Sequence, residues 1–258
     1  MPQIAAAGHR IEYAWIGARG APALVFLHEG LGSIQQWRDF PQRLCERAGA
    51  RGLVYDRYGY GQSDVLAEPR VGTDFMHREA QDALPELLRG LGLEAPVLVG
   101  HSDGASIALI HAGSGHPVRA LVLMAPHVFV EEISVRSIEA ARRQFETTDL
   151  RARLARYHRD PDKTFRLWND AWLDPAFRDW NIEPYLPRIR CPVLAIQGED
   201  DEYGTLAQVE AIARQVAGPC RLVKLPACGH SPFKDQPEAV LDAVSTFLDE
   251  IDAHNPSG

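Results

Sequence analysis

The sequence predicts an α/β fold in which a mostly parallel sheet is covered by helices on both faces. Short apolar and β-branched runs alternate with segments whose apolar residues recur at helical spacing, the order that produces parallel strand–helix–strand units. Residues 128–190 depart from this alternation, because they carry helical patterns and no strand signal. We therefore expect one α/β core, residues 1–127 and 191–258, interrupted by an inserted helical cap at 128–190.

Six short buried strands are expected in the parallel part of the sheet, because parallel strands read as nearly continuous apolar runs. They are residues 23–27, 52–55, 96–99, 120–124, 193–196 and 221–225. Residues 10–16, before a turn at 17–22, are predicted to form an antiparallel edge strand. Helical spacing predicts sheet-covering helices over residues 75–91 and 239–251, the first kinked or broken at Pro85.

The predicted cap is rich in aromatic and arginine side chains. Its aromatic residues either pack in the small core of the cap or line a substrate pocket, for which Trp168 and Trp172 are the candidates. Its arginines should mostly lie on solvated helix faces, although one or two inward guanidinium groups would suit a substrate carboxylate. These arginines are Arg142, Arg143, Arg151, Arg153, Arg156 and Arg159.

Composition narrows the choice of partners. The formal net charge of -8 gives no global attraction toward nucleic acid or anionic lipid, so neither is an expected partner. No apolar run approaches the ~18 residues of a membrane span, and residues 1–10 lack a charged and then apolar leader, so we expect a cytoplasmic protein with a small-molecule substrate. The 4 cysteines form no CxxC pair, and no metal is predicted. Oligomeric state is not specified by the sequence.

Residues 100–104 read Gly-His-Ser-Asp-Gly, a G-x-S-x-G pattern between a predicted buried strand and a predicted helix. A sharp turn there would expose Ser102 at a helix N-terminus, where a base can activate its hydroxyl and the helix dipole favours developing negative charge. A helix-capping serine is the alternative interpretation. The predicted strand before Ser102 and the predicted helix after it favour the interpretation of this serine as a nucleophile.

A general base and an acid to orient it are expected later in the chain, in the order Ser, Asp, His. His230 lies in a short glycine-flanked loop directly beyond the last predicted strand, at the sheet edge where ligands gather. Residues 199–202 are four consecutive carboxylates after another strand, which suit either a solvated acidic loop or the acid that orients His230. They lack the spacing of a calcium loop, and spacing alone does not select one of the four.

The chain resembles the α/β-hydrolase superfamily over essentially its whole length. The likeness is carried by His28-Glu-Gly-Leu-Gly-Ser33, by residues 56–64, by the segment around Ser102, and by residues 198–201 with Gly229-His230. The resemblance implies the α/β-hydrolase fold with Asp201 as the acid, three residues after Gly198, and Asp200 as the fallback. It also implies an oxyanion hole made by the backbone N–H groups of Gly30 and Asp103, each contributing about 3 kcal/mol. His28 should brace that loop.

One position departs from the pattern, since many relatives have glycine where this chain has Glu29. Its carboxylate is expected either to bond to the 56–64 loop or to Arg57, or to face the substrate and disfavour anions. His127 is a further candidate for the substrate pocket. The 56–64 segment is not a phosphate or dinucleotide loop, because it has no G-x-x-x-x-G-K and Asp64 replaces the third glycine, so no cofactor is predicted.

The predicted function is hydrolysis of a small or medium carboxylic ester or a lactone, through an acyl-enzyme on Ser102. A carbon–carbon bond hydrolase acting on a diketone from aromatic ring cleavage would use the same three residues. A ligand receptor or pseudoenzyme on the same fold is the alternative from another class, because a fold alone does not establish activity. Haloalkane dehalogenation is set aside, because relatives with that activity have a carboxylate in place of Ser102.

Overall fold

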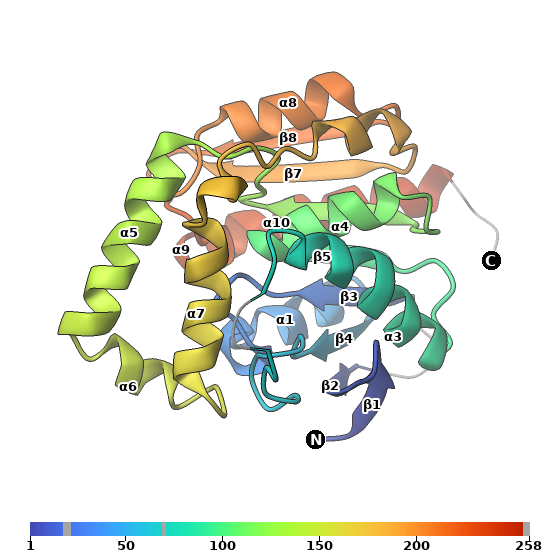
Figure 1. Ribbon diagram of the computed structural model, residues 1–258. Helices are drawn as coiled ribbons and strands as arrows, with labels where there is room; N and C mark the ends of the chain where they lie inside the picture. Colours follow the sequence, from blue (N-terminus) through green and yellow to red (C-terminus); the bar gives the residue numbers. More distant parts are fainter. Residues whose placement is uncertain (18–21, 69–70, 255–258) are drawn as a thin grey trace.

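The structure, a computed structural model, describes residues 1–17, 22–68 and 71–254 (Figure 1). Within these residues eight strands form one sheet in the order β1-β2-β4-β3-β5-β6-β7-β8. The pairs from β4 to β8 are parallel, and the pairs β1-β2 and β2-β4 are antiparallel. The strands are β1 (Gln3–Ala6), β2 (His9–Ile16), β3 (Ala23–Leu27), β4 (Arg51–Tyr55), β5 (Val97–His101), β6 (Ala120–Met124), β7 (Val193–Gly198) and β8 (Cys220–Leu225).

The predicted fold class is confirmed, and the six predicted parallel strands agree with the observed ones to within one or two residues at each end. The prediction of residues 10–16 as an edge strand is wrong in one respect. They lie in β2, which is antiparallel to β4, but β1 pairs on its outer side, from Gln3 opposite Glu12 to Ala6 opposite His9. β1 is too short and too rich in alanine to give a strand pattern. Residues 18–21 of the predicted turn lie outside the described residues.

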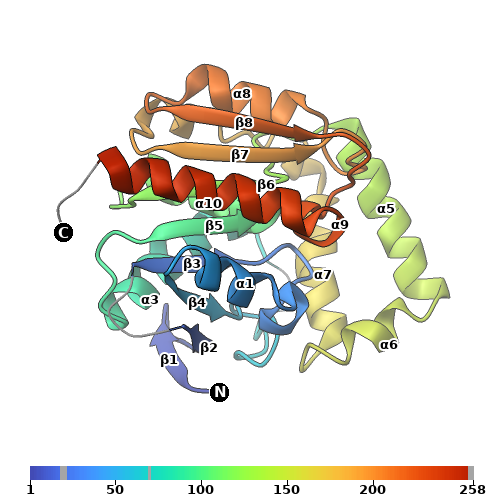
Figure 2. The same cartoon turned by 180° about the vertical axis from the view of Figure 1, so that it is seen from behind.

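Helices cover both faces of the sheet (Figures 1 and 2). In β3, Leu24 and Phe26 pack in the hydrophobic cluster beneath α1 and α10, whereas Val25 and Leu27 pack in the cluster beneath α3, α4 and α8. This alternation follows from the two-residue period of a strand, and it explains why a strand buried on both faces is apolar throughout. The helices are α1 (Phe40–Arg47), α3 (Leu84–Gly90), α4 (Asp103–Gly113), α8 (Ala207–Gln215) and α10 (Pro237–His254).

The predicted helix over residues 75–91 changes its register before Pro85. It consists of α2 (Phe75–Arg78), the π-helical segment η2 (Glu79–Ala83) and α3. Proline has no N–H to donate, and its ring would clash with the carbonyl four residues earlier, so a register change at this point accommodates it. The predicted helix at 239–251 lies inside α10.

The chain between β6 and β7 is helical, with a single isolated bridge between Phe129 and Asn181 among the described residues. Figures 1 and 2 show α5, α6 and α7 beyond the end of the sheet at which the parallel strands terminate. The helical elements of this segment are α5 (Glu132–Thr147), α6 (Leu150–Leu154), α7 (Pro161–Trp172), η3 (Pro175–Phe177) and η4 (Glu183–Arg188). Two short helices, η1 (Ile34–Trp37) and α9 (Pro232–Asp235), follow the loops after β3 and β8.

Candidate active site

Ser102 lies at the turn between β5 and α4, as the G-x-S-x-G pattern predicts. Its backbone has φ 53° and ψ -122°, a strained left-handed conformation for a residue other than glycine. The turn is tightly packed, because a Cβ on Gly104 would collide with the backbone carbonyl of Leu27. The strain is therefore held in place by the surrounding backbone, and it presents the Ser102 side chain at the carboxyl end of the sheet.

His230 joins Ser102 to Asp201. Its Nε2 lies 2.9 Å from Ser102 Oγ, and its Nδ1 lies 2.9 Å from each carboxylate oxygen of Asp201. With the ring proton on Nδ1, His230 donates to Asp201 and Nε2 accepts from the serine hydroxyl. The three predicted residues, which come from loops after β5, β7 and β8, thus form one hydrogen-bonded chain.

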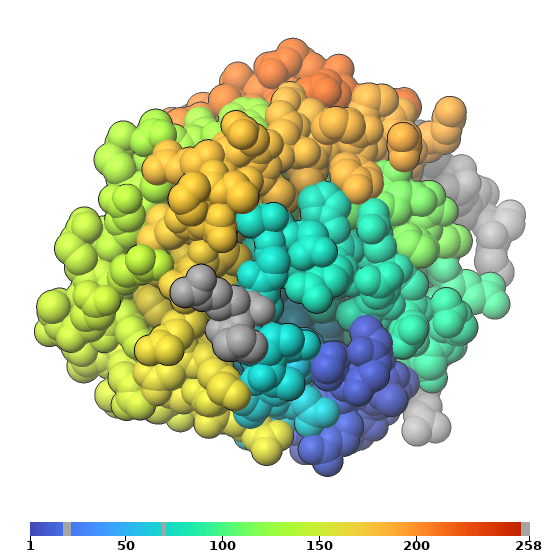
Figure 3. All heavy atoms as spheres, viewed as in Figure 1, coloured from blue at the N-terminus to red at the C-terminus, as the bar shows by residue number. Residues whose placement is uncertain are grey.

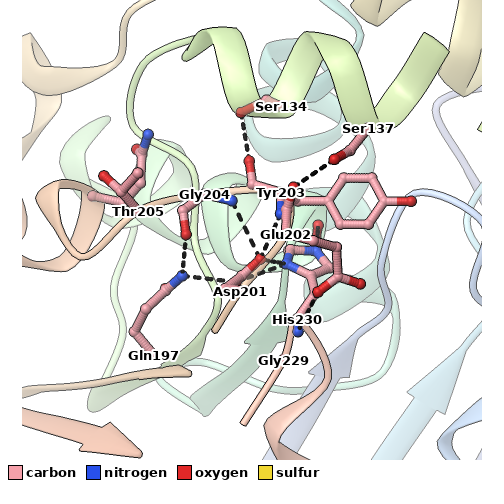
Figure 4. Close-up of polar contacts among 12 residues, drawn as sticks. Ser134, Ser137, Gln197, Asp201, Glu202, Tyr203, Gly204, Thr205, Gly229 and His230 are labelled. Carbon is pink, nitrogen blue, oxygen red and sulfur yellow. Dashed lines mark hydrogen bonds and ion pairs between the residues drawn. The ribbon is translucent and has the colours of Figure 1, made fainter. Parts of the chain in front are cut away.

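The carboxylate of Asp201 is the buried one among the four consecutive acids, whereas Glu199, Asp200 and Glu202 are exposed. Figure 4 shows the groups that hold it. It accepts hydrogen bonds from Gln197 Nε2 at 2.7 Å and from the backbone N–H groups of Tyr203 at 2.7 Å and Gly204 at 3.2 Å. Burial alone would raise the pKa of Asp201, but the hydrogen bond from His230 and the backbone donors outweigh it and lower this pKa. Asp201 is therefore ionised at neutral pH.

Sequence reasoning missed the helix that anchors this acidic loop. From α5, Ser134 Oγ donates to the carbonyl of Tyr203 and Ser137 Oγ donates to the carbonyl of Glu202 (Figure 4). The Glu202 carboxylate in turn accepts from the backbone N–H of His230 at 3.2 Å. Serines on a surface helix give no sequence signal for such bonds. A signal was present for Gln197, which is a polar residue at the end of a buried strand.

The two residues predicted to supply the oxyanion donors, Gly30 and Asp103, line the same cavity as Ser102. Among the described residues, neither the backbone N–H of Gly30 nor that of Asp103 has a hydrogen-bond acceptor. The loop that carries Gly30 is held by Arg57, whose backbone N–H donates to His28 Nε2 at 3.1 Å and whose Nη2 donates to the Glu29 carbonyl at 2.8 Å. His28 is fully buried there and braces the loop, as expected.

A cavity of about 200 Å³ lies over Ser102 and His230. All four predicted pocket residues, Glu29, His127, Trp168 and Trp172, line it. Trp172 Nε1 donates to Asp103 Oδ1 at 3.1 Å, and burial raises the pKa of Asp103 to about 6. Burial lowers the pKa of His127 to about 3, so its imidazole is neutral in the cavity wall.

Comparison with known proteins gives a family for this fold and geometry. Residues 24–243 match the model of the alpha/beta hydrolase family. The chain belongs to this family. Epoxide hydrolase 3 of Xenopus tropicalis is 25% identical over 94% of this chain and 76% of its own length, and the serine hydrolase BPHL of Mus musculus is 27% identical over 89% and 79%. A solved hydrolase from Pseudomonas aeruginosa PA01 superimposes with a TM-score of 0.73 at 25% identity, covering 96% of this chain and 97% of that one.

In this alpha/beta hydrolase, Glu29 takes partners that the sequence did not indicate. Its carboxylate lies 3.3 Å from Lys234 Nζ and 3.5 Å from His101 Nδ1. The expected pairing with Arg57 is wrong for the side chain, because Arg57 contacts only the backbone carbonyl of Glu29. Burial opposes the charge of Glu29, but Lys234 and His101 outweigh it, and the pKa of Glu29 lies well below its ordinary value.

None of the arginines between β6 and β7 is among the described residues that line the cavity. Of the six arginines predicted to lie on solvated faces, three form exposed ion pairs outside the cavity, Arg142 with Asp170, Arg151 with Asp162 and Arg153 with Asp149. The prediction of solvated arginine faces is therefore correct for these three. The idea that an inward arginine holds a substrate carboxylate is wrong for the described cavity.

A second cavity of about 240 Å³ opens between the N-terminal strand and the segment that leads into α2, where Figure 3 shows a hollow in the surface. It contains no member of the Ser102, His230 and Asp201 chain, so the cavity above Ser102 is the candidate active site.

Within the described part of the chain, no group of three or more His, Cys, Asp or Glu side chains is placed to hold a metal ion. No helix in the same residues has the length and apolar character to cross a membrane.

Proposed function

We propose that this chain is a serine hydrolase that cleaves a small or medium carboxylic ester or a lactone through an acyl-enzyme on Ser102. The observation that carries the proposal is the contact of 2.9 Å between Ser102 Oγ and His230 Nε2, beside two unpaired backbone N–H groups. A hydroxyl that donates to an imidazole nitrogen is activated for attack on an acyl carbon, because that nitrogen can take its proton. The relative named serine hydrolase supports the same chemistry.

The proposed reaction starts when Ser102 Oγ attacks the acyl carbonyl and His230 Nε2 takes its proton. Asp201, which is bonded to His230 Nδ1, stabilises the imidazolium that forms. The N–H groups of Gly30 and Asp103 donate to the oxyanion, and each contributes about 3 kcal/mol to the tetrahedral intermediate. His230 then protonates the leaving alcohol, and in the second half it activates water to hydrolyse the acyl-enzyme.

We also propose that residues 128–190 act as a cap over a core of residues 1–127 and 191–258. This segment supplies Trp168 and Trp172 to the cavity wall, and its helix α5 is bonded to the loop that carries Asp201. Two indole rings above the serine exclude water from the cavity, and a dry site strengthens the electrostatic interactions in it. The cap therefore limits acyl size and supports the acid at the same time.

The test is steady-state hydrolysis of 4-nitrophenyl acetate, 4-nitrophenyl butanoate and a δ-lactone by the wild type and by Ser102→Ala. The wild type should turn over at least one of them, and the variant should lose about 10³-fold or more of kcat. A coloured ring-fission diketone is measured in parallel, since its faster turnover would replace the proposal with carbon–carbon hydrolysis. Binding of these compounds without any product would instead indicate a receptor.

A further inference from the structure

The wall of the cavity has an uneven charge. Its described lining includes three carboxylates, Glu29, Asp103 and Glu202, in addition to His230 and Ser102, and it includes no lysine or arginine. Lys234 contacts Glu29 but is not part of this lining. Glu29 is therefore part of the cavity wall, whereas the lysine that pairs with its carboxylate is not.

Glu29 is next to Gly30, so its carboxylate lies one residue from a proposed oxyanion donor. Its contacts of 3.3 Å to Lys234 and 3.5 Å to His101 are long for charge-assisted hydrogen bonds, and its oxygens keep the capacity to accept from a ligand. A Cβ on Gly32 would overlap this carboxylate, which shows that the side chain is packed against its own loop. The charge is thus held at a fixed position beside the place where the acyl group reacts.

A second carboxylate, that of Asp103, lies close to the same cavity. Asp103 is among the residues that line the cavity, but it has no exposed surface. Its carboxylate accepts one hydrogen bond, from Trp172 Nε1 to Oδ1. Its Oδ2 has no hydrogen-bond partner, and a buried oxygen without one is costly. The positive charge of Arg57 favours the ionised form of this carboxylate. Since Asp103 has no accessible surface, its carboxylate adds negative charge from beneath the cavity wall rather than by contact with a ligand.

We propose that Glu29 is a specificity-determining residue, which with Asp103 makes the cavity select esters that carry a positive charge or an N–H donor near the scissile bond and reject anionic esters. The selection is electrostatic, because like charges repel and opposite charges attract strongly in a site that excludes water. Glu202 is exposed at the mouth of the cavity and contributes less, since solvent screens it. This inference rests on the proposed ester hydrolysis and names its substrate class.

Two pairs of isosteric substrates test the inference on the two sides of the ester bond. On the acyl side, 4-nitrophenyl 4-(trimethylammonio)butanoate is compared with 4-nitrophenyl 5,5-dimethylhexanoate. On the alcohol side, acetylthiocholine is compared with 3,3-dimethylbutyl thioacetate. The quantity measured is the ratio of kcat/KM for the cationic and the neutral member of each pair, which cancels effects common to both.

The variants are Glu29→Gln, Lys234→Met and, as a matched control, Glu94→Gln. Glu94 is exposed and precedes β5, whereas Ser102 follows the other end of this strand, so this control changes the net charge equally at a residue that does not line the cavity. Thermal unfolding of each variant verifies that it is folded. If the pair of Glu29 and Lys234 were only structural, both variants of the pair would alter the ratio alike. If the charge of Glu29 selects the substrate, the two variants should differ in their effect on the ratio, because Lys234→Met leaves Glu29 without its compensating ammonium.

In the wild type the ratio of kcat/KM for the cationic and the neutral substrate should exceed about five in at least one pair. It should fall by about fivefold or more in Glu29→Gln, stay equal or rise in Lys234→Met, and stay equal in Glu94→Gln. A wild-type ratio of one or less in both pairs, or an unchanged ratio in Glu29→Gln, would overturn the inference and leave ester hydrolysis intact. Failure of the wild type to hydrolyse any ester would overturn the proposed function and this inference with it.

Discussion

Replacement of Asp201 by asparagine tests how the site orients its base. Asp201 accepts from His230 Nδ1 at 2.9 Å and from three further donors, of which the Tyr203 and Gly204 N–H groups reach Oδ1 at 2.7 and 3.2 Å and Gln197 Nε2 reaches Oδ2 at 2.7 Å. The single carbonyl oxygen of an asparagine would stay at the Oδ1 position, where two backbone N–H groups donate to it, and its amide group would then take the Oδ2 position, within reach of His230 Nδ1. The imidazole would respond by carrying its proton on Nε2, where it faces Ser102 Oγ and cannot accept the serine proton.

The expected loss in Asp201→Asn is about 10⁴-fold in kcat, equal to about 5 kcal/mol of transition-state stabilisation, with KM little changed. The assay is hydrolysis of the best ester substrate at pH 7.5, with a thermal unfolding measurement beside it. Asp200→Asn is the matched control, because it removes the same charge from an exposed neighbour and should keep kcat within about twofold. If Asp201→Asn kept more than a tenth of the wild-type kcat, or if Asp200→Asn were equally damaging, the assignment of Asp201 would be refuted.

Two further substitutions probe the oxyanion loop and the buried acid. A Cβ on Gly30 would overlap the indole of Trp168, so Gly30→Ala should displace the donor and lower kcat by about 10²-fold, whereas an unchanged kcat would exclude Gly30 from oxyanion binding. Burial raises the pKa of Asp103 from 3.8 to about 6, so this group favours the native state below pH 4 and loses that contribution as pH rises through 6. In denaturant titrations, the unfolding free energy at pH 5 minus that at pH 7.5 should therefore be about 1 kcal/mol lower in Asp103→Asn than in the wild type. The same value in both proteins would contradict the burial effect.

Much of the core was predictable from local patterns. The parallel strands are buried on both faces, so their apolar runs are continuous, and the predicted strand at 120–124 coincides with β6. The position of the proposed nucleophile was also predictable, because the turn at Ser102 requires small neighbours at fixed spacing. β1 was not predicted, because four residues that end in two alanines carry little pattern.

The acid required more than local sequence. Residues 199–202 are all carboxylates, and what distinguishes Asp201 is burial and its bonds to Gln197 and His230, which depend on the packed structure. The family resemblance selected Asp201 by position, with Asp200 as the fallback. In the structure, Asp201 is the residue of these four whose carboxylate contacts His230 Nδ1, and its role as the orienting acid is part of the proposed function.

The environment of Glu29 lay beyond sequence reasoning. Its partner Lys234 is 205 positions away along the chain, and no periodicity connects residues at that distance. The arginines between β6 and β7 were equally ambiguous, since the same composition suits a solvated helix face and an inward anion site. The cytoplasmic location stays a prediction from composition.

The most direct test of the central claim is labelling by a fluorophosphonate, which reacts with an activated serine hydroxyl. After the reaction, peptide mass spectrometry should locate the adduct on Ser102 in the wild type. Ser102→Ala should remain unlabelled, and His230→Ala should label far more slowly, because the serine then has no base at 2.9 Å. Equal labelling of Ser102→Ala, or an adduct on any other residue, would contradict the account.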